Sequence, residues 1–274
     1  RIQPEEITLQ AIEWIRKLGF DSINLDLMYG LPFQTNESFE RTVQKIMQIS
    51  PDRIAVFNYA HVPWLKKHMN LIKVEDLPKP EVKLEILKMA TEKLTSGGYS
   101  FIGMDHFAKP DDELAIALRE KKLYRNFQGY STRAGADLYA FGITAISQLT
   151  NVYAQNHKVE KDYYEALDAA KIPTGKGYRL NEDDKIRRYV VMKVMCDFAL
   201  NFKEVEEKFE IDFRKYFNWG LNNLKEMVED ELVELEKDSL TVTEVGRLLV
   251  RNIAMNFDGY IERKEDIGKY SKTL

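Results

Sequence analysis

Two adjacent residues, Asp105 and His106, stand where an apolar run ends in the segment Phe101-Ile-Gly-Met-Asp-His-Phe-Ala108. A carboxylate beside an imidazole suits proton handling, because the pKa of histidine lies near neutrality. We therefore expect His106 to bind an acidic group of a ligand or to relay a proton. The alternative is a structural histidine that is hydrogen-bonded beside Asp105.

A second chemical feature is the polar and aromatic segment Arg125-Asn-Phe-Gln-Gly-Tyr-Ser-Thr132. Its side chains are too polar for a core and too aromatic for a plain solvated loop. Phe127 and Gln128 stand side by side, and an aromatic ring beside an amide suits a flat ligand with polar edges. The sequence predicts that this loop lines a ligand cavity; the alternative is that Phe127 fills the core.

Polar residues also recur along the predicted strands and at their ends. Asp26 lies inside a strand pattern, where an unpaired carboxylate is costly, so it should meet a donor, a ligand, or a core Arg or Lys. Asn58, Tyr59 and His61 gather at the end of the next strand. Ligand sites form at the carboxyl ends of parallel strands, so these residues predict a site; capping of a helix or turn is the alternative.

Helices and strands alternate over the first part of the chain. Apolar stripes, cap residues and breakers predict helices over 4–18, 35–50 and 81–96 and strands over 22–29, 53–59 and 99–104. Strands separated by helices indicate βαβ units and a parallel sheet. The predicted fold class is therefore α/β.

The character of the chain changes from about Asn151. We expect helices over 158–170, 181–200, 213–229 and 243–257, a Pro/Gly connector over 172–177 and a short hairpin over 232–242. Helix, hairpin, helix is a winged-helix-like order. The predicted domains are residues 1–155 and a mainly helical domain over 156–274.

The composition is that of an ordinary soluble surface around a substantial core: 44% of the 274 residues are hydrophobic, 31% are charged, and the net charge is −4. This balance argues against nucleic acid or an anionic membrane as partner, and no apolar run reaches the roughly 18 residues of a spanning helix.

Cys196 is the only cysteine, which excludes an internal disulfide and fits a reducing cytoplasm. It stands in an apolar helical stretch and is predicted to be a buried structural thiol. The histidines show no zinc-binding spacing.

The segments 101–108 and 125–132, together with Asp26-Leu-Met-Tyr-Gly-Leu-Pro32, resemble the oxygen-independent coproporphyrinogen III oxidase (dehydrogenase) family. The resemblance runs along nearly the whole chain. It implies the later units of a partial TIM-like (β/α) radical SAM (S-adenosylmethionine) barrel, a sheet extension, and a mostly helical, winged-helix-like C-terminal domain. It also implies that the chain is the later part of a longer enzyme.

Enzymes of that family remove carboxylate and hydrogen from two propionates of coproporphyrinogen III, giving protoporphyrinogen IX in haem biosynthesis. The resemblance implies SAM and a [4Fe–4S] cluster, a porphyrinogen substrate, an electron donor or acceptor, and a monomeric full-length enzyme in the cytoplasm. A cluster needs three or four thiolates, and the family's Cys-x-x-x-Cys-x-x-Cys motif is absent from this sequence. This chain alone is therefore expected to bind no cluster and to be inactive.

The resemblance also implies cofactor-binding residues. The family's positions map onto six residues of this chain: Arg1, Asp26, Ala60, Phe127, Gln128 and Ile146. The first three are expected to contact SAM, Ala60 because a small residue lets the backbone approach the cofactor; the alternative for Arg1 is a solvated end of the chain. The last three are expected to enclose a second SAM or the substrate side of the cavity. No catalytic residue and no metal ligand is assigned.

Two other functions stay open. Haem-binding chaperones of the same superfamily typically carry Tyr-Glu-Ile-Ser-Asn-Phe-Ala where this chain has Gly103-Met-Asp-His-Phe-Ala108, and the Asp-His pair favours the oxidase. A winged-helix interaction module would need a basic recognition helix. Residues 222–231 carry one lysine against four acidic side chains, which argues against DNA.

Overall fold

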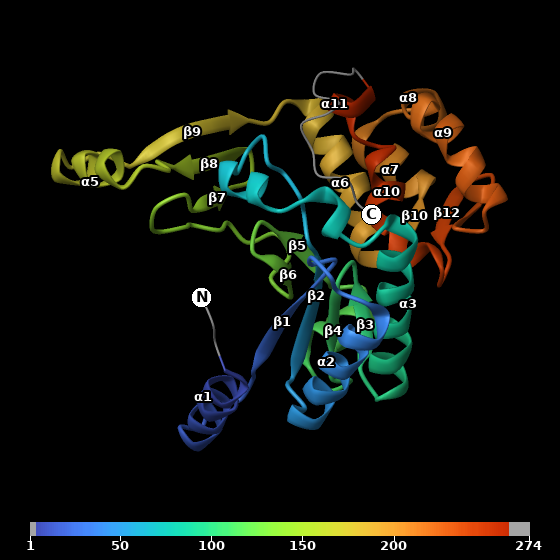
Figure 1. Ribbon diagram of the computed structural model, residues 1–274. Helices are drawn as coiled ribbons and strands as arrows, with labels where there is room; N and C mark the ends of the chain where they lie inside the picture. The colour runs from blue at the N-terminus through green and yellow to red at the C-terminus, as the bar shows by residue number, and fades with distance from the viewer. Residues whose placement is uncertain (1–3, 263–274) are drawn as a thin grey trace. The chain divides into compact units, whose positions relative to one another are not determined.

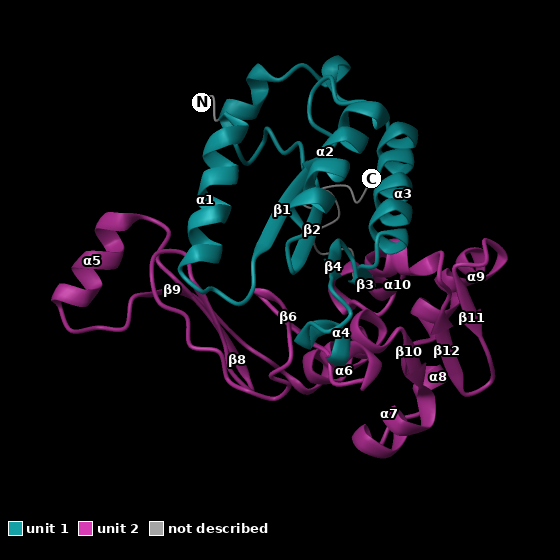
Figure 2. Ribbon diagram, turned by 90° about the horizontal axis from the view of Figure 1, so that it is seen from below, with its two compact units in different colours: residues 1–116, 268–274 teal, residues 117–267 magenta. Residues whose placement is uncertain are grey.

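The computed structural model describes residues 4–262 and divides them into two units, residues 4–116 and residues 117–262 (Figure 1, Figure 2). Each unit has its own sheet structure and its own buried side chains. The boundary predicted at residue 155 instead separates a part with alternating helices and strands from a mainly helical part. It stays a prediction.

Unit 1 combines one sheet with helices. Its described elements are α1 (Glu5–Lys17), β1 (Asn24–Tyr29), α2 (Asn36–Ile49), β2 (Arg53–Asn58), η1 (Lys67–Leu71), η2 (Val74–Asp76), α3 (Pro80–Ser96), β3 (Ser100–Gly103), β4 (His106–Ala108) and α4 (Glu113–Arg119), which runs into unit 2. The strand order is β1-β2-β4-β3. β1 and β2 are parallel, as predicted, with Asp26 opposite Ala55.

The third predicted strand is only partly right, because the chain reverses at its end. Met104 and Asp105 form a two-residue turn after β3, with Met104 in the left-handed region (φ 49°). β4 then pairs antiparallel with both β3 and β2 and separates them. His106 lies in β4, so the prediction that Asp105 and His106 together close one strand was wrong. A three-residue strand around a single Phe107 is too short to give a periodic pattern.

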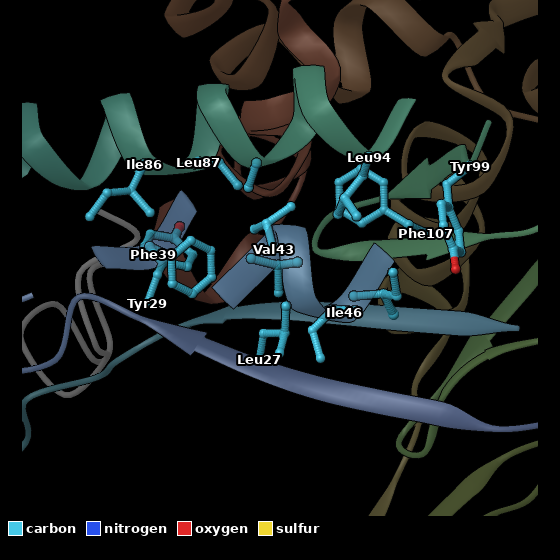
Figure 3. Packing of buried hydrophobic residues seen from close by; sticks show 13 residues of the cluster. Leu27, Tyr29, Phe39, Val43, Ile46, Ile86, Leu87, Leu94, Tyr99 and Phe107 are labelled. Atoms are coloured by element: carbon cyan, nitrogen blue, oxygen red, sulfur yellow. The ribbon is translucent and has the colours of Figure 1, made fainter. Parts of the chain in front are cut away.

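The core of unit 1 lies where α2 and α3 cover one face of the sheet (Figure 3). Buried side chains from β1, α2 and α3 meet there: Leu27, Tyr29, Phe39, Val43, Ile46, Ile86, Leu87 and Leu94. Burying each large apolar side chain contributes about 1.5–3 kcal/mol, so this layer holds the strands in place. Thr35 caps α2 by accepting the backbone N–H of Ser38, as predicted.

Helix α1 confirms the first predicted helix, which begins after Pro4. Its apolar stripe is not buried among the described residues: the exposed fraction is 59% for Trp14 and 76% for Leu18. None of the described helices combines the length and the apolar composition that crossing a bilayer requires.

Unit 2 is built from small sheets and helices. Its described strands are β5 (Tyr124–Asn126), β6 (Gly129–Ser131), β7 (Ile146–Gln148), β8 (Val152–Asn156), β9 (Thr174–Arg179), β10 (Ala199–Asn201), β11 (Val233–Leu235) and β12 (Ser239–Val242). Its described helices are α5 (Glu160–Asp168), α6 (Glu182–Asp197), α7 (Phe202–Phe209), α8 (Phe213–Tyr216), α9 (Asn218–Glu229), η3 (Gly246–Leu249), α10 (Val250–Met255) and α11 (Gly259–Glu262). The mixed α/β class is confirmed, and none of the sheets formed by residues 4–262 closes into a barrel.

The strands of unit 2 pair locally. β5 and β6 form a hairpin, and β7, β8 and β9 form an antiparallel sheet. The connector predicted over 172–177 was wrong, because Thr174–Arg179 is strand β9 and pairs with β8. Every residue of β9 is exposed. The strand is held by backbone hydrogen bonds to β8, so its sequence shows no alternation of apolar and polar residues.

The last part of unit 2 follows the predicted order of helix, hairpin and helix. The helix predicted over 213–229 divides near Phe217 into α8 and α9, and β11 and β12 form the hairpin. The strand β10 joins that hairpin, which the sequence did not predict. Thr243 accepts the Gly246 N–H through Oγ1 at 3.0 Å, just before η3 and α10. The core of this region is aromatic: the rings of Phe202 and Phe213 stack with centroids 4.1 Å apart.

Candidate functional site

The carboxyl ends of β1 and β2 meet at one edge of the unit 1 sheet. Gly30 follows β1 with φ +81°, and a Cβ on it would lie 3.0 Å from Oδ1 of Asn58. The turn is held by Gln34, whose Oε1 accepts the Gly30 N–H at 2.6 Å. Tyr59 donates its N–H to the carbonyl of Tyr29 at 2.7 Å. Glycine is therefore needed where the two strand ends approach each other.

Ala60 stands at this same edge, two residues beyond the end of β2, and is half-buried. His61 follows it, with Nδ1 at 3.4 Å from the hydroxyl of Tyr59. The structure thus brings Ala60 and the polar residues that were predicted around it to one end of the sheet.

Asp26 lies on the face of β1 that points away from the core of unit 1, because Leu27 and Tyr29 alternate with it and are buried. Its carboxylate is exposed and accepts one hydrogen bond, from Nδ2 of Asn24 at 2.7 Å. No arginine or lysine within the described residues forms an ion pair with Asp26. The side chain is thus a solvated acceptor, and the core pairing considered as its alternative is not formed.

His106 lies on the same sheet face as Asp26. The register aligns Asp26 with Ala55 on β2, and Ala55 with His106 on β4. Neighbouring strands are about 4.8 Å apart, so the backbones of Asp26 and His106 are roughly 10 Å apart across this face. The imidazole is half-buried and meets Phe57 edge to face, with centroids 5.9 Å apart. A carboxylate and an imidazole therefore face the same side of unit 1.

Phe127 and Gln128 form the two-residue turn of the β5–β6 hairpin in unit 2. The Gln128 N–H donates to Oδ1 of Asn126 at 2.8 Å, and its side chain is exposed. Phe127 is 53% exposed and meets Tyr153 edge to face, with centroids 5.2 Å apart. An aromatic side chain this exposed is not core filler, so that alternative is removed.

A cavity of about 350 Å³ lies behind this turn. Residues of the hairpin, of β7 and β8 and of α6 line it: Arg125, Asn126, Phe127, Gln148, Tyr153, Arg188, Val191, Met192 and Met195. Two hydrogen bonds fix its walls. The Tyr130 hydroxyl donates to the carbonyl of Met195 at 3.1 Å, and Nε2 of Gln148 donates to the Tyr124 hydroxyl at 2.9 Å. The volume lies at the lower end of the range for small-molecule sites.

The predicted site residues of unit 2 relate to this cavity in different ways. Phe127 lines it. Ile146 lies two residues from Gln148 on β7, hence on the same side of that strand, and is half-buried. Gln128 stands at the exposed tip of the hairpin.

Sequence reasoning missed the contribution of α6 to this cavity. Arg188, Met192 and Met195 follow the i, i+4, i+7 spacing of one helix face. That spacing is visible in the sequence, but it is equally typical of a helix that packs into a core. Arg1, also predicted as a cofactor contact, lies outside the described residues.

Cys196 is buried, as predicted, and burial is the main cause that raises the pKa of its thiol to about 12. Such a thiol stays protonated and is a poor metal ligand. Residues 4–262 contain no group of three or more His, Cys, Asp or Glu side chains arranged to hold a metal ion. The sequence has one cysteine, whereas a [4Fe–4S] cluster needs three or four thiolates, so the cluster does not fit the side chains of this chain.

Known proteins have similar sequences and a similar fold. Residues 180–249 match the family described as HemN C-terminal domain. The chain is 48% identical to the oxygen-independent coproporphyrinogen III oxidase of Thermostichus vulcanus, over 96% of this chain and 82% of that protein. The chain belongs to the oxygen-independent coproporphyrinogen III oxidase family.

Two further members of this oxidase family extend the comparison. The relative from Synechocystis sp. is 49% identical over the whole chain. The solved coproporphyrinogen III oxidase (HemN) of Escherichia coli, a radical SAM enzyme, superposes with a TM-score of 0.89 at 45% identity over 95% of this chain. The chain spans 60% of the length of each of these two proteins. The resemblance seen in the sequence is thus confirmed, while the roles of the individual site residues stay predictions.

Proposed function

We propose that this chain is the later part of an oxygen-independent coproporphyrinogen III oxidase. The whole protein would convert two propionates of coproporphyrinogen III to the vinyl groups of protoporphyrinogen IX, and each propionate would lose CO₂, one hydrogen atom to the SAM-derived radical and one electron to an acceptor. The observation that carries the proposal is the 48% identity to such an oxidase over 82% of that relative's length. The proposal includes two partners, coproporphyrinogen and an electron donor or acceptor. It also includes a monomeric full-length protein in the cytoplasm.

In this proposal unit 1 supplies part of the SAM site. Asp26 offers an exposed carboxylate to the ammonium or hydroxyl groups of SAM, and such charge-assisted hydrogen bonds are the strong ones. Ala60 lets the backbone approach the cofactor at the edge where β1 and β2 end, and Arg1 would add a contact. When bound, SAM and the cluster supply the hydrogen-abstracting radical chemistry. The thiolates for the cluster come from outside this chain, so this chain alone would be inactive.

Unit 2 would bind and orient the second ligand. Phe127, Gln128 and Ile146 enclose a second SAM or the substrate side of the cavity. The hairpin turn supplies an aromatic ring and an amide at consecutive positions, and Phe127 lines the cavity behind it. His106, on the Asp26 face of unit 1, would bind a propionate or relay a proton.

The fold belongs to the same proposal. β1 to β4 with α2 and α3 represent the later units of a TIM-like radical SAM barrel, and residues 156–274 form a winged-helix-like domain after a domain over 1–155. A DNA-binding role for that last domain is disfavoured, because α9 carries Lys225 against Glu226 and Glu229. The 48% identity to an oxidase disfavours the second alternative, a haem-binding chaperone.

The test uses the full-length protein, purified anaerobically and reconstituted with iron and sulfide. With SAM, a reductant for the cluster and an electron acceptor it should convert coproporphyrinogen III to protoporphyrinogen IX, measured by porphyrin fluorescence after oxidation. This chain alone, treated identically, should form no product and show no cluster absorption near 400 nm. A full-length protein that binds haem but never decarboxylates the substrate would favour the chaperone and overturn the proposal.

A further inference from the structure

Two guanidinium groups line the cavity behind the hairpin turn, and neither has a carboxylate partner among residues 4–262. Arg125, on β5, and Arg188, on α6, both line it. In the part of the chain that the structure describes, neither arginine forms an ion pair. The contacts of Arg188 are neutral: its Nη2 donates to the carbonyl of Thr150 at 3.0 Å, and its Nη1 lies 3.4 Å from the Tyr153 hydroxyl.

Arg125 is less satisfied still. Its Nη1 is buried and has no hydrogen-bond acceptor among the residues that the structure describes. Its Cζ lies 5.0 Å from the ring centroid of Tyr130, the residue opposite it in the hairpin. A cation–π contact stabilises the charge but accepts no N–H hydrogen bond. A buried charged donor without an acceptor is costly, so its position beside a cavity calls for an acceptor that arrives with a ligand.

The other walls indicate the chemistry of that ligand. Phe127 and Tyr153 present an edge-to-face aromatic pair, and Met192 and Met195 offer an adaptable apolar surface. Arginine forks match carboxylates in a bidentate manner. The cavity volume of about 350 Å³ suits one ring and one acidic arm better than a whole tetrapyrrole.

We infer that Arg125 and Arg188 form a carboxylate-binding pair that holds a propionate of the substrate, with its pyrrole ring against Phe127 and Tyr153. This inference rests on the proposed function and deepens it, because it names two substrate-binding residues. SAM also carries a carboxylate, so the same pair would suit its methionine end. The experiment therefore measures both ligands separately.

The experiment uses full-length protein and the air-stable probe coproporphyrin III, with its neutral tetramethyl ester as the matched ligand. Wild-type protein should bind the free acid more tightly than the ester. Arg188→Ala and Arg125→Gln should each weaken binding of the acid about tenfold to a hundredfold and leave the ester unaffected. Arg188→Lys should retain part of the preference, since it keeps the charge and loses the fork. The matched control is Arg251→Ala, at an exposed position on α10.

Calorimetric titration with SAM and thermal melting complete the set. Unchanged SAM affinity and melting temperature, with loss of the preference for the acid, is the expected result. Weakened SAM binding with unchanged porphyrin binding would assign the pair to SAM and overturn the inference. Unchanged binding of both ligands would also overturn it, while continued turnover would leave the proposed function intact. Wild-type protein that neither binds coproporphyrin III nor converts coproporphyrinogen III would reject both proposals.

Discussion

The two units of this chain present their candidate chemistry in different ways. In unit 1, Asp26 and His106 lie on one face of a sheet whose opposite face is packed by α2 and α3. In unit 2, the hairpin turn, two strands and α6 converge on a cavity. The first arrangement fixes side-chain direction through strand alternation, whereas the second depends on tertiary packing of distant segments.

The supporting cores differ as well. Unit 1 uses mainly aliphatic side chains, with Tyr29 and Phe39 at one end of the cluster and Tyr99 and Phe107 at the other (Figure 3). Unit 2 uses an aromatic group in which Phe213 contacts Phe202, Phe217 and Phe257. The difference teaches that a ligand surface on a sheet should tolerate local damage better than a cavity assembled from several elements.

The largest expected effect tests whether the two cores act separately. Phe213→Ala should lower the free energy of unfolding by about 3–5 kcal/mol and Ile86→Ala by about 2–5 kcal/mol, since both side chains are fully buried. Hydrogen exchange should show lost protection in α6 and β10 for Phe213→Ala, and in β1 and β2 for Ile86→Ala. If either substitution lowered protection equally in both units, the two cores would not act separately.

The next effect concerns the exposed carboxylate of unit 1. Asp26→Ala in the full-length protein should weaken SAM binding about tenfold to a hundredfold, the consequence of losing about 1.5–3 kcal/mol from a charge-assisted hydrogen bond. The melting temperature should stay unchanged, because Asp26 is exposed and has no role in the core. Calorimetric titration and thermal melting separate these effects, with exposed Asp21→Ala as control. A large drop in melting temperature at unchanged affinity would make Asp26 a structural residue.

The parts of the fold that sequence reasoning predicted are those with long local patterns. The stripe Phe39, Val43 and Ile46 and the cap at Thr35 predicted α2 because both follow helix geometry. The patterns failed where structure depends on partners. Strand β4 follows a two-residue turn, and β9 has no buried residue, so neither leaves an apolar period in the sequence.

The candidate site divides in the same way. Asp26 was visible because a carboxylate interrupts an apolar strand, and Phe127 because an aromatic stands in a polar loop. Arg188 was not visible, because a charged residue on a helix usually lies on its solvated face. Its position beside a cavity depends on Gln148 and Phe127 from other elements, and no local pattern records that convergence.

A smaller effect is expected at the tip of the hairpin. Gln128→Ala in the full-length enzyme should lower turnover about twofold to tenfold, the range for losing one neutral hydrogen bond to a ligand. Folding should be unaffected, since the side chain is exposed. Anaerobic assays of protoporphyrinogen formation test this, with exposed Gln44→Ala on α2 as the matched control. Wild-type rates for Gln128→Ala would remove this residue from the site.

The last effect concerns stability at alkaline pH and lies in α6 next to the cavity, where Cys196 follows Met195. Burial raises the pKa of the Cys196 thiol to about 12 in the folded chain, against about 8.5 for an unfolded cysteine. The unfolded state therefore loses its proton first as the pH rises. The stability contributed by the protonated thiol is complete below pH about 8.5 and declines up to about pH 12, by at most about 1.4 kcal/mol per pH unit. Urea unfolding at pH 8, 9 and 10 should therefore show a shallower decline for Cys196→Ala than for wild type. Parallel declines would mean that the thiol ionises equally well in both states, and that this side of α6 is open to water as its cavity side is.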